Sequence, residues 1–137
     1  MHDDVMDATE LLHASMPLCR TLGMSGSEAS ADRVVAHLGW NADLCTAGGL
    51  LHGGAMMALA DAAGGACAFL NLPDGGVGTS TIESKTNFLG AVRDGSTLTA
   101  TATALHRGRS TIVIETELRL DSGKLVGKTT QTQTVLY

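Results

Sequence analysis

The stretch that decides the fold is residues 50–70, LLHGGAMMALADAAGGACAFL, which joins helix-forming apolar residues to a single carboxylate. Between Asp43 and Asp74 the chain contains no Asp, Glu, Lys or Arg other than Asp61. A surface helix carries several charges opposite its apolar stripe, so a helix here has no evident solvent side. We therefore expect a central helix over about 52–72 that is enclosed by protein, and Asp61 needs an explanation.

A membrane span is the alternative for this run, because residues 50–72 are long enough to cross a bilayer. The run is built largely of Ala and Gly, however, and contains His52 and Asp61. A central Asp costs about 2.5–3.5 kcal/mol on insertion scales, which weakly hydrophobic residues do not offset. We expect a helix buried in protein and no membrane partner.

Composition predicts one globular domain over residues 1–137, with 44% hydrophobic and 17% charged residues. The net charge of -5 and nine scattered Lys and Arg residues argue against a nucleic-acid partner. Cys19, Cys45 and Cys67 form no paired motif, and the acidic start MHDDVMDATE does not have the pattern of a secretory signal. These features predict a reducing, cytoplasmic location.

Period-two patterns follow the central helix and predict an antiparallel meander at 96–106, 110–120 and 125–136, with turns at 107–108 and 121–124. A preceding strand at about 79–89, closed by Asp94-Gly95, would make four, so the strands lie mainly within 77–136. Before the helix we expect a short amphipathic helix at about 7–16, two short strands within 22–39 and a loop at 40–49. The PDGG sequence at 73–76 is expected to stop the central helix.

One face of the strand at 110–120 is apolar and the other is polar. The apolar face carries Ile112, Ile114, Leu118 and Leu120; the polar face carries Thr111, Glu115, Glu117 and Arg119. The apolar side must pack on the central helix, and a single sheet covers only one side of that helix. A second subunit is needed to cover the remaining apolar surface of the helix, so the sequence predicts at least a homodimer.

A long helix wrapped by an antiparallel sheet is the hotdog arrangement, an α+β fold, and the chain resembles hotdog-fold acyl-CoA thioesterases of the phenylacetic-acid-degradation (PaaI) type. The most specific match is His52-Gly53-Gly54 with Asp61 nine residues after the His. The other matching segments are Met16-Pro17, Leu22-Gly23, Leu59-Ala60, Thr81 to Leu89 ending in Asn87-Phe88-Leu89, Gly108-Arg109 and Asp121-Ser122-Gly123-Lys124.

This resemblance implies hydrolysis of acyl-CoA to an acid and free CoA, without a metal or redox cofactor, by a tetramer built from dimers. It implies that the Gly53 amide binds the thioester carbonyl and that Asp61 is the nucleophile or a general base on water. Thr81 matches a position that helps to orient the water or the carboxylate. Thr46 stands where the family usually has Asn or Gln; Thr lacks the amide's reach and donor, so that contact is either water-mediated or absent.

The residues support these roles but leave alternatives open. A helix start presents unpaired N–H groups, and Gly53-Gly54 would let a carbonyl oxygen approach them; the glycines could instead serve tight packing. His52 either positions the thioester or caps the helix. A lone Asp61 is ordinarily a satisfied buried group or faces a water-filled groove, but groups placed in this way often have functions.

Geometry predicts that His52 and Asp61 of one chain do not serve the same carbonyl. Nine residues at 1.5 Å rise separate them by roughly 13–14 Å along the helix axis, whereas water attack and oxyanion binding need a separation of about 3 Å. The partner's helix must bring its Asp61 to this chain's helix start. Each active site is therefore expected at a dimer interface.

Six residues are candidates for substrate contact: Thr46, Gly54, Met57, Asn87, Arg107 and Arg109. Met57, like Met56, either lines the acyl pocket or fills the core. Arg107 and Arg109 either grip a CoA phosphate or form a solvated hairpin tip. One rival function is an acyl-CoA sensor without activity; a sensor would tolerate loss of the acid, but this chain retains Asp61. A second rival is a hotdog dehydratase, which would need an HFP loop that this chain lacks.

Overall fold

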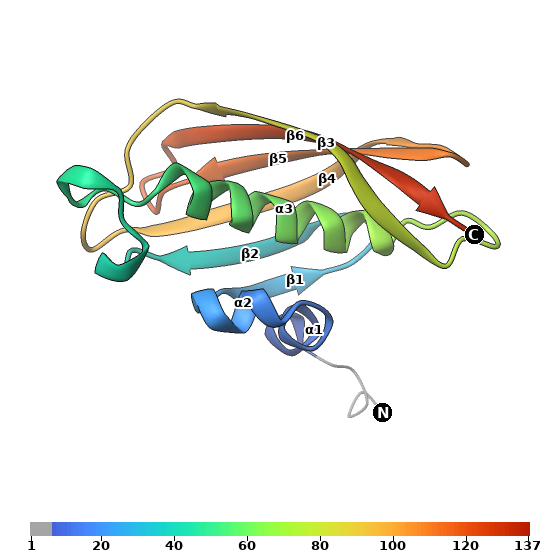
Figure 1. The fold of residues 1–137 in the computed structure, drawn as a ribbon, viewed down its shortest axis with the longest axis horizontal. Helices are drawn as coiled ribbons and strands as arrows, with labels where there is room; N and C mark the ends of the chain where they lie inside the picture. Colours follow the sequence, from blue (N-terminus) through green and yellow to red (C-terminus); the bar gives the residue numbers. More distant parts are fainter. Residues whose placement is uncertain (1–6) are drawn as a thin grey trace.

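Residues 7–137 are described by a computed structural model, in which one long helix crosses one face of a six-stranded antiparallel sheet (Figure 1). The helix is α3, Gly53–Phe69. The strands are β1 (Ser25–Ala29), β2 (Val34–Gly39), β3 (Gly78–Phe88), β4 (Thr97–Arg107), β5 (Thr111–Arg119) and β6 (Leu125–Leu136), in the order β1-β2-β4-β5-β6-β3. The expected α+β hotdog fold is confirmed.

Helix α3 is shorter at its end than the expected 52–72. It begins with His52 as the N-cap, as expected, but stops at Phe69, with Leu70 as the C-cap. The Asn71 side chain explains the early end, because its Nδ2 donates to the Cys67 carbonyl at 2.8 Å and to the Ala31 carbonyl at 3.0 Å. The chain therefore leaves the helix before the PDGG turn.

The N-terminal segment contains a helix that the sequence pattern did not predict. Helix α1 (Ala8–Ser15) begins after Asp7, whose side chain accepts a bond from the Glu10 N–H, much as expected. Pro17 then starts a second helix, α2 (Pro17–Leu22), because proline is compatible with the first turn of a helix. The loop at 40–49 holds two 3₁₀ turns, Ala42–Leu44 and Ala47–Gly49.

Strand β3 does not lie beside β4, as a four-strand meander would require. The meander of β4, β5 and β6 is confirmed, but β2 pairs with β4 on one side and β3 pairs with β6 on the other. The reason is that α3 connects β2 to β3 and crosses the sheet while doing so (Figure 1). The segment around Asp94-Gly95 is consequently a crossover and not a hairpin.

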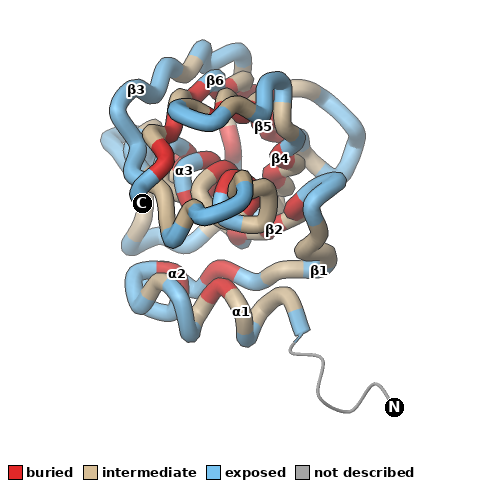
Figure 2. The backbone as a smooth tube through the Cα atoms, turned by 90° about the vertical axis from the view of Figure 1, so that its right-hand side faces the viewer, coloured by how far each residue is buried: buried red, intermediate tan, exposed pale blue. Residues whose placement is uncertain are grey.

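The core lies between α3 and the sheet (Figure 2). Ile112, Ile114 and Leu118 are fully buried and Leu120 is partly buried, as the alternation in β5 predicts. Each such side chain contributes about 1.5–3 kcal/mol on burial. Small residues let the helix approach the sheet closely; the fully buried alanines are Ala36, Ala60, Ala63, Ala68, Ala100 and Ala102.

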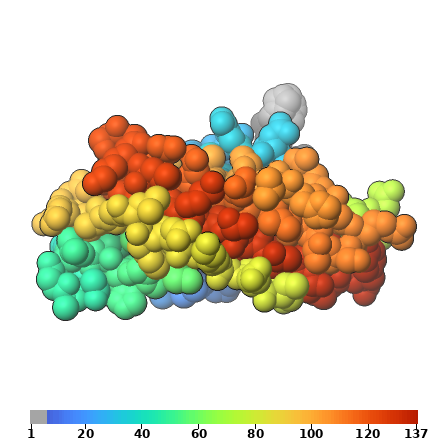
Figure 3. All heavy atoms as spheres, turned by 90° about the horizontal axis from the view of Figure 1, so that it is seen from above, coloured from blue at the N-terminus to red at the C-terminus, as the bar shows by residue number. Residues whose placement is uncertain are grey.

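The two edges of the sheet differ in how they are covered. At the β1 edge, Thr9 Oγ1 of α1 bonds to both the N–H and the C=O of Gly26, at 2.9 and 3.1 Å. Strand β3, at the other edge, is exposed along most of its length, including Ile82 and Phe88. Figure 3 shows this strand, in yellow, as a band on the surface beside β6 in red. An open edge with exposed apolar side chains can pair with another strand.

Helix α3 has an uncovered face in the single chain, the side of the helix for which the sequence predicts a second subunit. Gly54, Met57, Asp61 and Phe69 are exposed on it, at spacings of three, four and eight residues that keep them on one side of a helix. One sheet covers one side of a helix, which explains the open face. Among residues 7–137, no helix has the length and apolar character needed to cross a membrane.

Candidate active site

Asp61 is held through one of its two carboxylate oxygens. Thr81 Oγ1 donates to Asp61 Oδ1 at 3.2 Å, and Gln131 Nε2 donates to the same oxygen at 3.1 Å. Within residues 7–137, no hydrogen bond involves Asp61 Oδ2. The carboxylate is therefore fixed at Oδ1, while Oδ2 is open to react.

Thr81 is oriented in turn by a second glutamine. It lies opposite Gln133 in the β3–β6 register, and Gln133 Nε2 donates to Thr81 Oγ1 at 2.5 Å. A hydroxyl that accepts one bond directs its single proton elsewhere, in this case to Asp61. The register of β3 shifts between Thr81 and Glu83, and such bulges re-aim side chains near active sites.

Asp61 and Thr81 line a pocket of about 540 Å³ between α3, β3 and the N-terminal helices. Its walls are mostly apolar: Leu11, Leu12, Met16, Ala66, Phe69 and Leu70. Among residues 7–137, Asp61 is the only charged residue that lines it. The arrangement provides an apolar chamber with one carboxylate at its edge.

The start of α3 has one free donor. His52 Nδ1 accepts from the Gly54 N–H at 2.7 Å, so His52 caps the helix and occupies the Gly54 amide. Within residues 7–137, no group accepts a hydrogen bond from the Gly53 N–H. Of the two adjacent amides, only that of Gly53 can donate to a ligand.

A second, smaller pocket of about 360 Å³ lies at this helix start and is lined by Gly53, Thr46 and Phe88. The Phe88 ring is so near that a Cβ added to Gly53 would lie 3.2 Å from it. The first pocket contains none of the residues that line this one. Gly53 and Asp61 thus belong to separate cavities of the single chain.

The other predicted contact residues lie outside both pockets. Met57 is exposed on the open face of α3, whereas Met56 is buried and lines the smaller pocket. Asn87 is exposed on β3, and its neighbour Phe88 lies over Gly53 instead.

Arg107 and Arg109 stand at the β4–β5 tip. Arg107 Nε donates to Asn71 Oδ1 at 2.6 Å, just beyond the end of α3, and the Arg109 carbonyl accepts from the Tyr137 hydroxyl at 2.6 Å. Both side chains are exposed. Within one chain they lie at the opposite end of α3 from Gly53 (Figure 1).

Other reactive side chains lie away from these pockets. Burial raises the pKa of the Cys19 thiol, with a smaller contribution from the Asp61 carboxylate, and burial also raises the pKa of the Cys67 thiol. Neither thiol is a ready nucleophile. No group of three or more His, Cys, Asp or Glu side chains in residues 7–137 could hold a metal ion.

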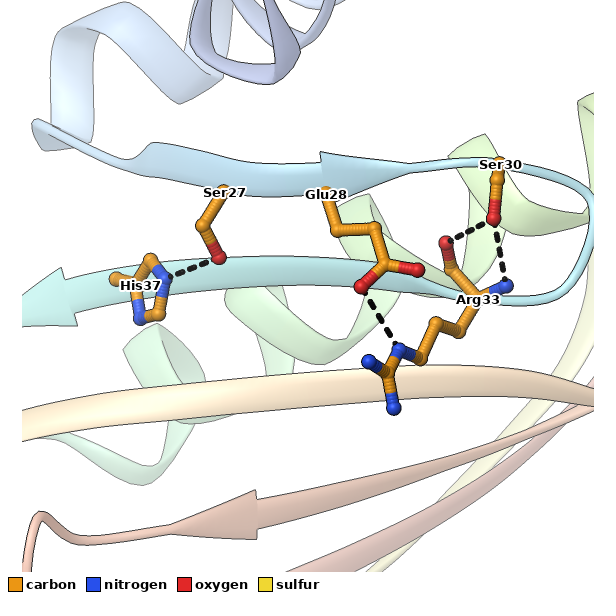
Figure 4. Close-up of polar contacts among 5 residues, drawn as sticks. All are labelled: Ser27, Glu28, Ser30, Arg33 and His37. Atoms are coloured by element: carbon orange, nitrogen blue, oxygen red, sulfur yellow. Dashed lines mark hydrogen bonds and ion pairs between the residues drawn. The ribbon is translucent and has the colours of Figure 1, made fainter.

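The structure also brings together a serine and a histidine, Ser27 on β1 and His37 on β2 (Figure 4). His37 Nε2 lies 2.9 Å from Ser27 Oγ, and His37 Nδ1 lies 2.9 Å from Thr99 Oγ1. A catalytic triad has a carboxylate as its third member, and neither pocket includes this pair. We assign it, with the adjacent Glu28–Arg33 ion pair of 2.8 Å, to the stability of the sheet.

Comparison with known families decides the chemistry of this fold. The family model described as the thioesterase superfamily matches residues 48–127, which is more than half of the chain. The chain belongs to the thioesterase superfamily. Its fold is the hotdog fold, and by family it is a thioester hydrolase. Comparison with curated proteins gave no match.

Solved structures agree with membership of the thioesterase superfamily. A thioesterase from Haemophilus influenzae is 26% identical, with 97% of this chain and 92% of that chain covered and a TM-score of 0.86. A mutant thioesterase from Pseudomonas aeruginosa is 29% identical, with 98% and 96% covered and a TM-score of 0.86. The Escherichia coli PaaI protein, from the phenylacetic acid degradation operon, has the same fold at 23% identity, with 93% and 89% covered and a TM-score of 0.82.

Two residues of this thioesterase-superfamily site, Gln131 and Gln133, were missed in the sequence. They lie in the segment TTQTQT at 129–134, where alternation puts Thr129, Gln131 and Gln133 on one face of β6. All three are buried. The available signal was a strand whose inward face, toward the helix, carries amides where aliphatic side chains are expected.

Proposed function

We propose that this protein is an acyl-CoA thioesterase that hydrolyses a CoA thioester to a carboxylic acid and free CoA. The observation that carries the proposal is the environment of Asp61. Hydrogen bonds fix its Oδ1 and leave its Oδ2 free, and within residues 7–137 it is the one charged side chain that lines an apolar pocket. A carboxylate held in this way can act on water, or attack directly, next to an apolar acyl group.

In the proposed reaction, Asp61 removes a proton from the water that attacks the thioester carbon, or attacks that carbon itself to form an anhydride that water then cleaves. In both routes the C–S bond breaks, hydroxyl from water ends on the acyl carbon and a proton ends on the CoA sulfur. The free Gly53 N–H stabilises the negative charge that develops on the carbonyl oxygen. The chemistry needs no metal or redox cofactor.

A homodimer would bring these two groups together. Gly53 and Asp61 are eight residues apart on one helix, which is about 12 Å along its axis at 1.5 Å per residue. A twofold axis that pairs the open β3 edges sets the two β3 strands, and hence the two α3 helices, antiparallel. The start of one α3 would then lie beside the middle of the other. We propose two sites per dimer, each with Gly53 from one subunit and Asp61 from the other, and a pairing of dimers into a tetramer.

The same pairing suits both ends of the substrate. The pocket beside Asp61 would take the acyl group, because its walls are apolar and its volume of about 540 Å³ exceeds that of a short acyl chain. In an antiparallel pair of helices, Arg107 and Arg109 at the end of one α3 would lie near the start of the other, where CoA phosphates could reach them.

All three cysteines are free thiols, which fits the reducing cytoplasm that we expect for the protein.

The direct test is release of free thiol from short, medium, long and aromatic acyl-CoAs, with and without EDTA. We expect turnover of at least one substrate and no effect of EDTA. Asp61→Asn should lower kcat by about 100-fold or more, as loss of a base or nucleophile does, without a change in Tm, because Asp61 is exposed.

Two results would count against this function. Near-normal turnover by Asp61→Asn would mean that another group activates the water. Tight binding of acyl-CoA without hydrolysis across the whole panel would favour the sensor.

A further inference from the structure

Two buried glutamine side chains on β6 act on the candidate catalytic carboxylate from beneath α3. Gln131 is 0% exposed and Gln133 is 2% exposed. Their cross-strand neighbours on β5 are Ile114 and Ile112, both fully buried. Burying an amide costs free energy unless its hydrogen bonds are made, so an aliphatic side chain would stabilise this part of the core more simply.

Gln131 is only half satisfied. Its Nε2 donates to Asp61 Oδ1 at 3.1 Å, but its Oε1 is buried and has no hydrogen-bond partner within residues 7–137. Leaving a buried acceptor unpaired destabilises the folded protein. The unpaired Oε1 of Gln131 therefore lowers the stability of the folded protein, while its Nε2 holds Asp61.

Helix α3 is shaped around this amide. A Cβ on Gly64 would collide with Gln131 Oε1, so only glycine lets Gln131 reach Asp61 along the underside of the helix. The next residue, Gly65, lines the large pocket, and a Cβ there would meet nothing within 4 Å. The two adjacent glycines thus have different roles: Gly64 makes room for the Gln131 amide, and Gly65 leaves space in the pocket.

We propose that Gln131 and Gln133 are positioning residues for Asp61, an inference that rests on the proposed thioesterase function. Gln131 donates directly to Asp61 Oδ1. Gln133 donates to Thr81, which directs its own proton to the same oxygen. Together they fix the carboxylate by Oδ1 and leave Oδ2 free for the water or the thioester carbon.

The test replaces each glutamine by methionine, which has a similar length and no amide. Gln131→Met should lower kcat by about 10- to 100-fold, the cost of a misplaced reacting group, with little change in KM. Gln133→Met should lower kcat by roughly fivefold, since it acts through one further hydrogen bond. A purely structural role predicts a lower Tm, whereas positioning predicts an unchanged or higher Tm together with the loss of kcat.

A matched control comes from Thr116 on β5, which is also fully buried and whose Oγ1 also has no partner within residues 7–137. Thr116→Val should leave kcat unchanged and should leave Tm unchanged or raised, because it removes an unpaired buried polar atom that does not contact Asp61. A loss of kcat in this variant equal to that in Gln131→Met would assign the effect to core packing and overturn the proposal.

A double-mutant comparison separates this inference from the function on which it rests. If Gln131 acts through Asp61, Gln131→Met should add nothing to the loss already caused by Asp61→Asn. Full kcat in Gln131→Met, with Asp61→Asn still inactive, would overturn the positioning role and leave the proposed function intact.

A crystal structure of Gln131→Met gives a readout that does not depend on activity. We expect the Asp61 carboxylate to leave its place beside Thr81. An unmoved carboxylate would also overturn the proposal.

Discussion

Gly53 and Asp61 lie on the same helix, eight residues apart, yet they line two pockets that share no residue. One supplies a free N–H and the other a free carboxylate oxygen. In the proposed reaction Asp61 attacks the thioester carbon, or activates the water that attacks it, while the Gly53 N–H binds the carbonyl oxygen, so both groups must lie at the same thioester. The predictions below follow from this separation and from the packing around Asp61.

Mixing two inactive variants should restore activity if each site joins two subunits. Asp61→Asn removes the acid, and Gly53→Pro removes the amide donor at a helical position, the first of α3, that tolerates proline. In a mixed dimer both lesions fall in one site and the other is intact, so equal amounts should regain about one quarter of wild-type activity by twofold counting. Thiol release after subunit exchange measures this.

Gly53→Ala is the matched control for the proline variant, because its Cβ crowds the Phe88 ring in the same way but the N–H remains. It should keep more activity than Gly53→Pro. With folding and subunit exchange established, a flat mixing curve would show that each site is built within one chain.

Adding a side chain at Gly65 should shorten the acyl pocket. Gly65 lines the pocket beside Asp61 and has open space at its Cβ position, so Gly65→Leu fills the cavity without displacing core residues. We expect kcat/KM for the longest accepted acyl-CoA to fall by about 10-fold or more, while acetyl-CoA changes much less. Equal losses across chain lengths would place the acyl group elsewhere.

Gly64→Ala should be more harmful than Gly65→Ala, although both exchanges normally favour a helix by about 0.5–1 kcal/mol. The Gly64 Cβ would strike Gln131 Oε1 and push the amide away from Asp61. We expect kcat to fall by about 10-fold or more in Gly64→Ala and to stay near wild type in Gly65→Ala with a short acyl-CoA. Comparable turnover of the two variants would mean that the Gln131 contact is dispensable.

Replacing Arg107 and Arg109 together by Ala should weaken binding of CoA itself. If the two side chains hold CoA phosphates, KM for acyl-CoA should rise by about 10-fold, since charge-assisted bonds to phosphate are strong. Hydrolysis of the matching acyl-pantetheine thioester, which lacks the nucleotide, should not change. Because Arg107 also bonds to Asn71, an equal loss with both substrates would assign the pair to structure.

The sequence by itself determined the central helix, the strands and their inward faces. The reason is that helices and strands depend on local sequence patterns. For α3 the pattern is an apolar run with a single carboxylate, and for β5 it is the alternation that buries Ile112, Ile114 and Leu118. The separation of Gly53 from Asp61 also follows from helix geometry alone.

Only the tertiary structure decided where β2 and β3 join the meander of β4, β5 and β6, and which groups meet Asp61. Sequence order placed β3 next to β4, but the passage of α3 across the sheet moves β3 to β6. That pairing brings Thr81 opposite Gln133 and sets Gln131 below Asp61, a contact between residues 70 positions apart. Periodicity records which face a side chain occupies, whereas the partner on that face depends on strand order, which is a property of the whole chain.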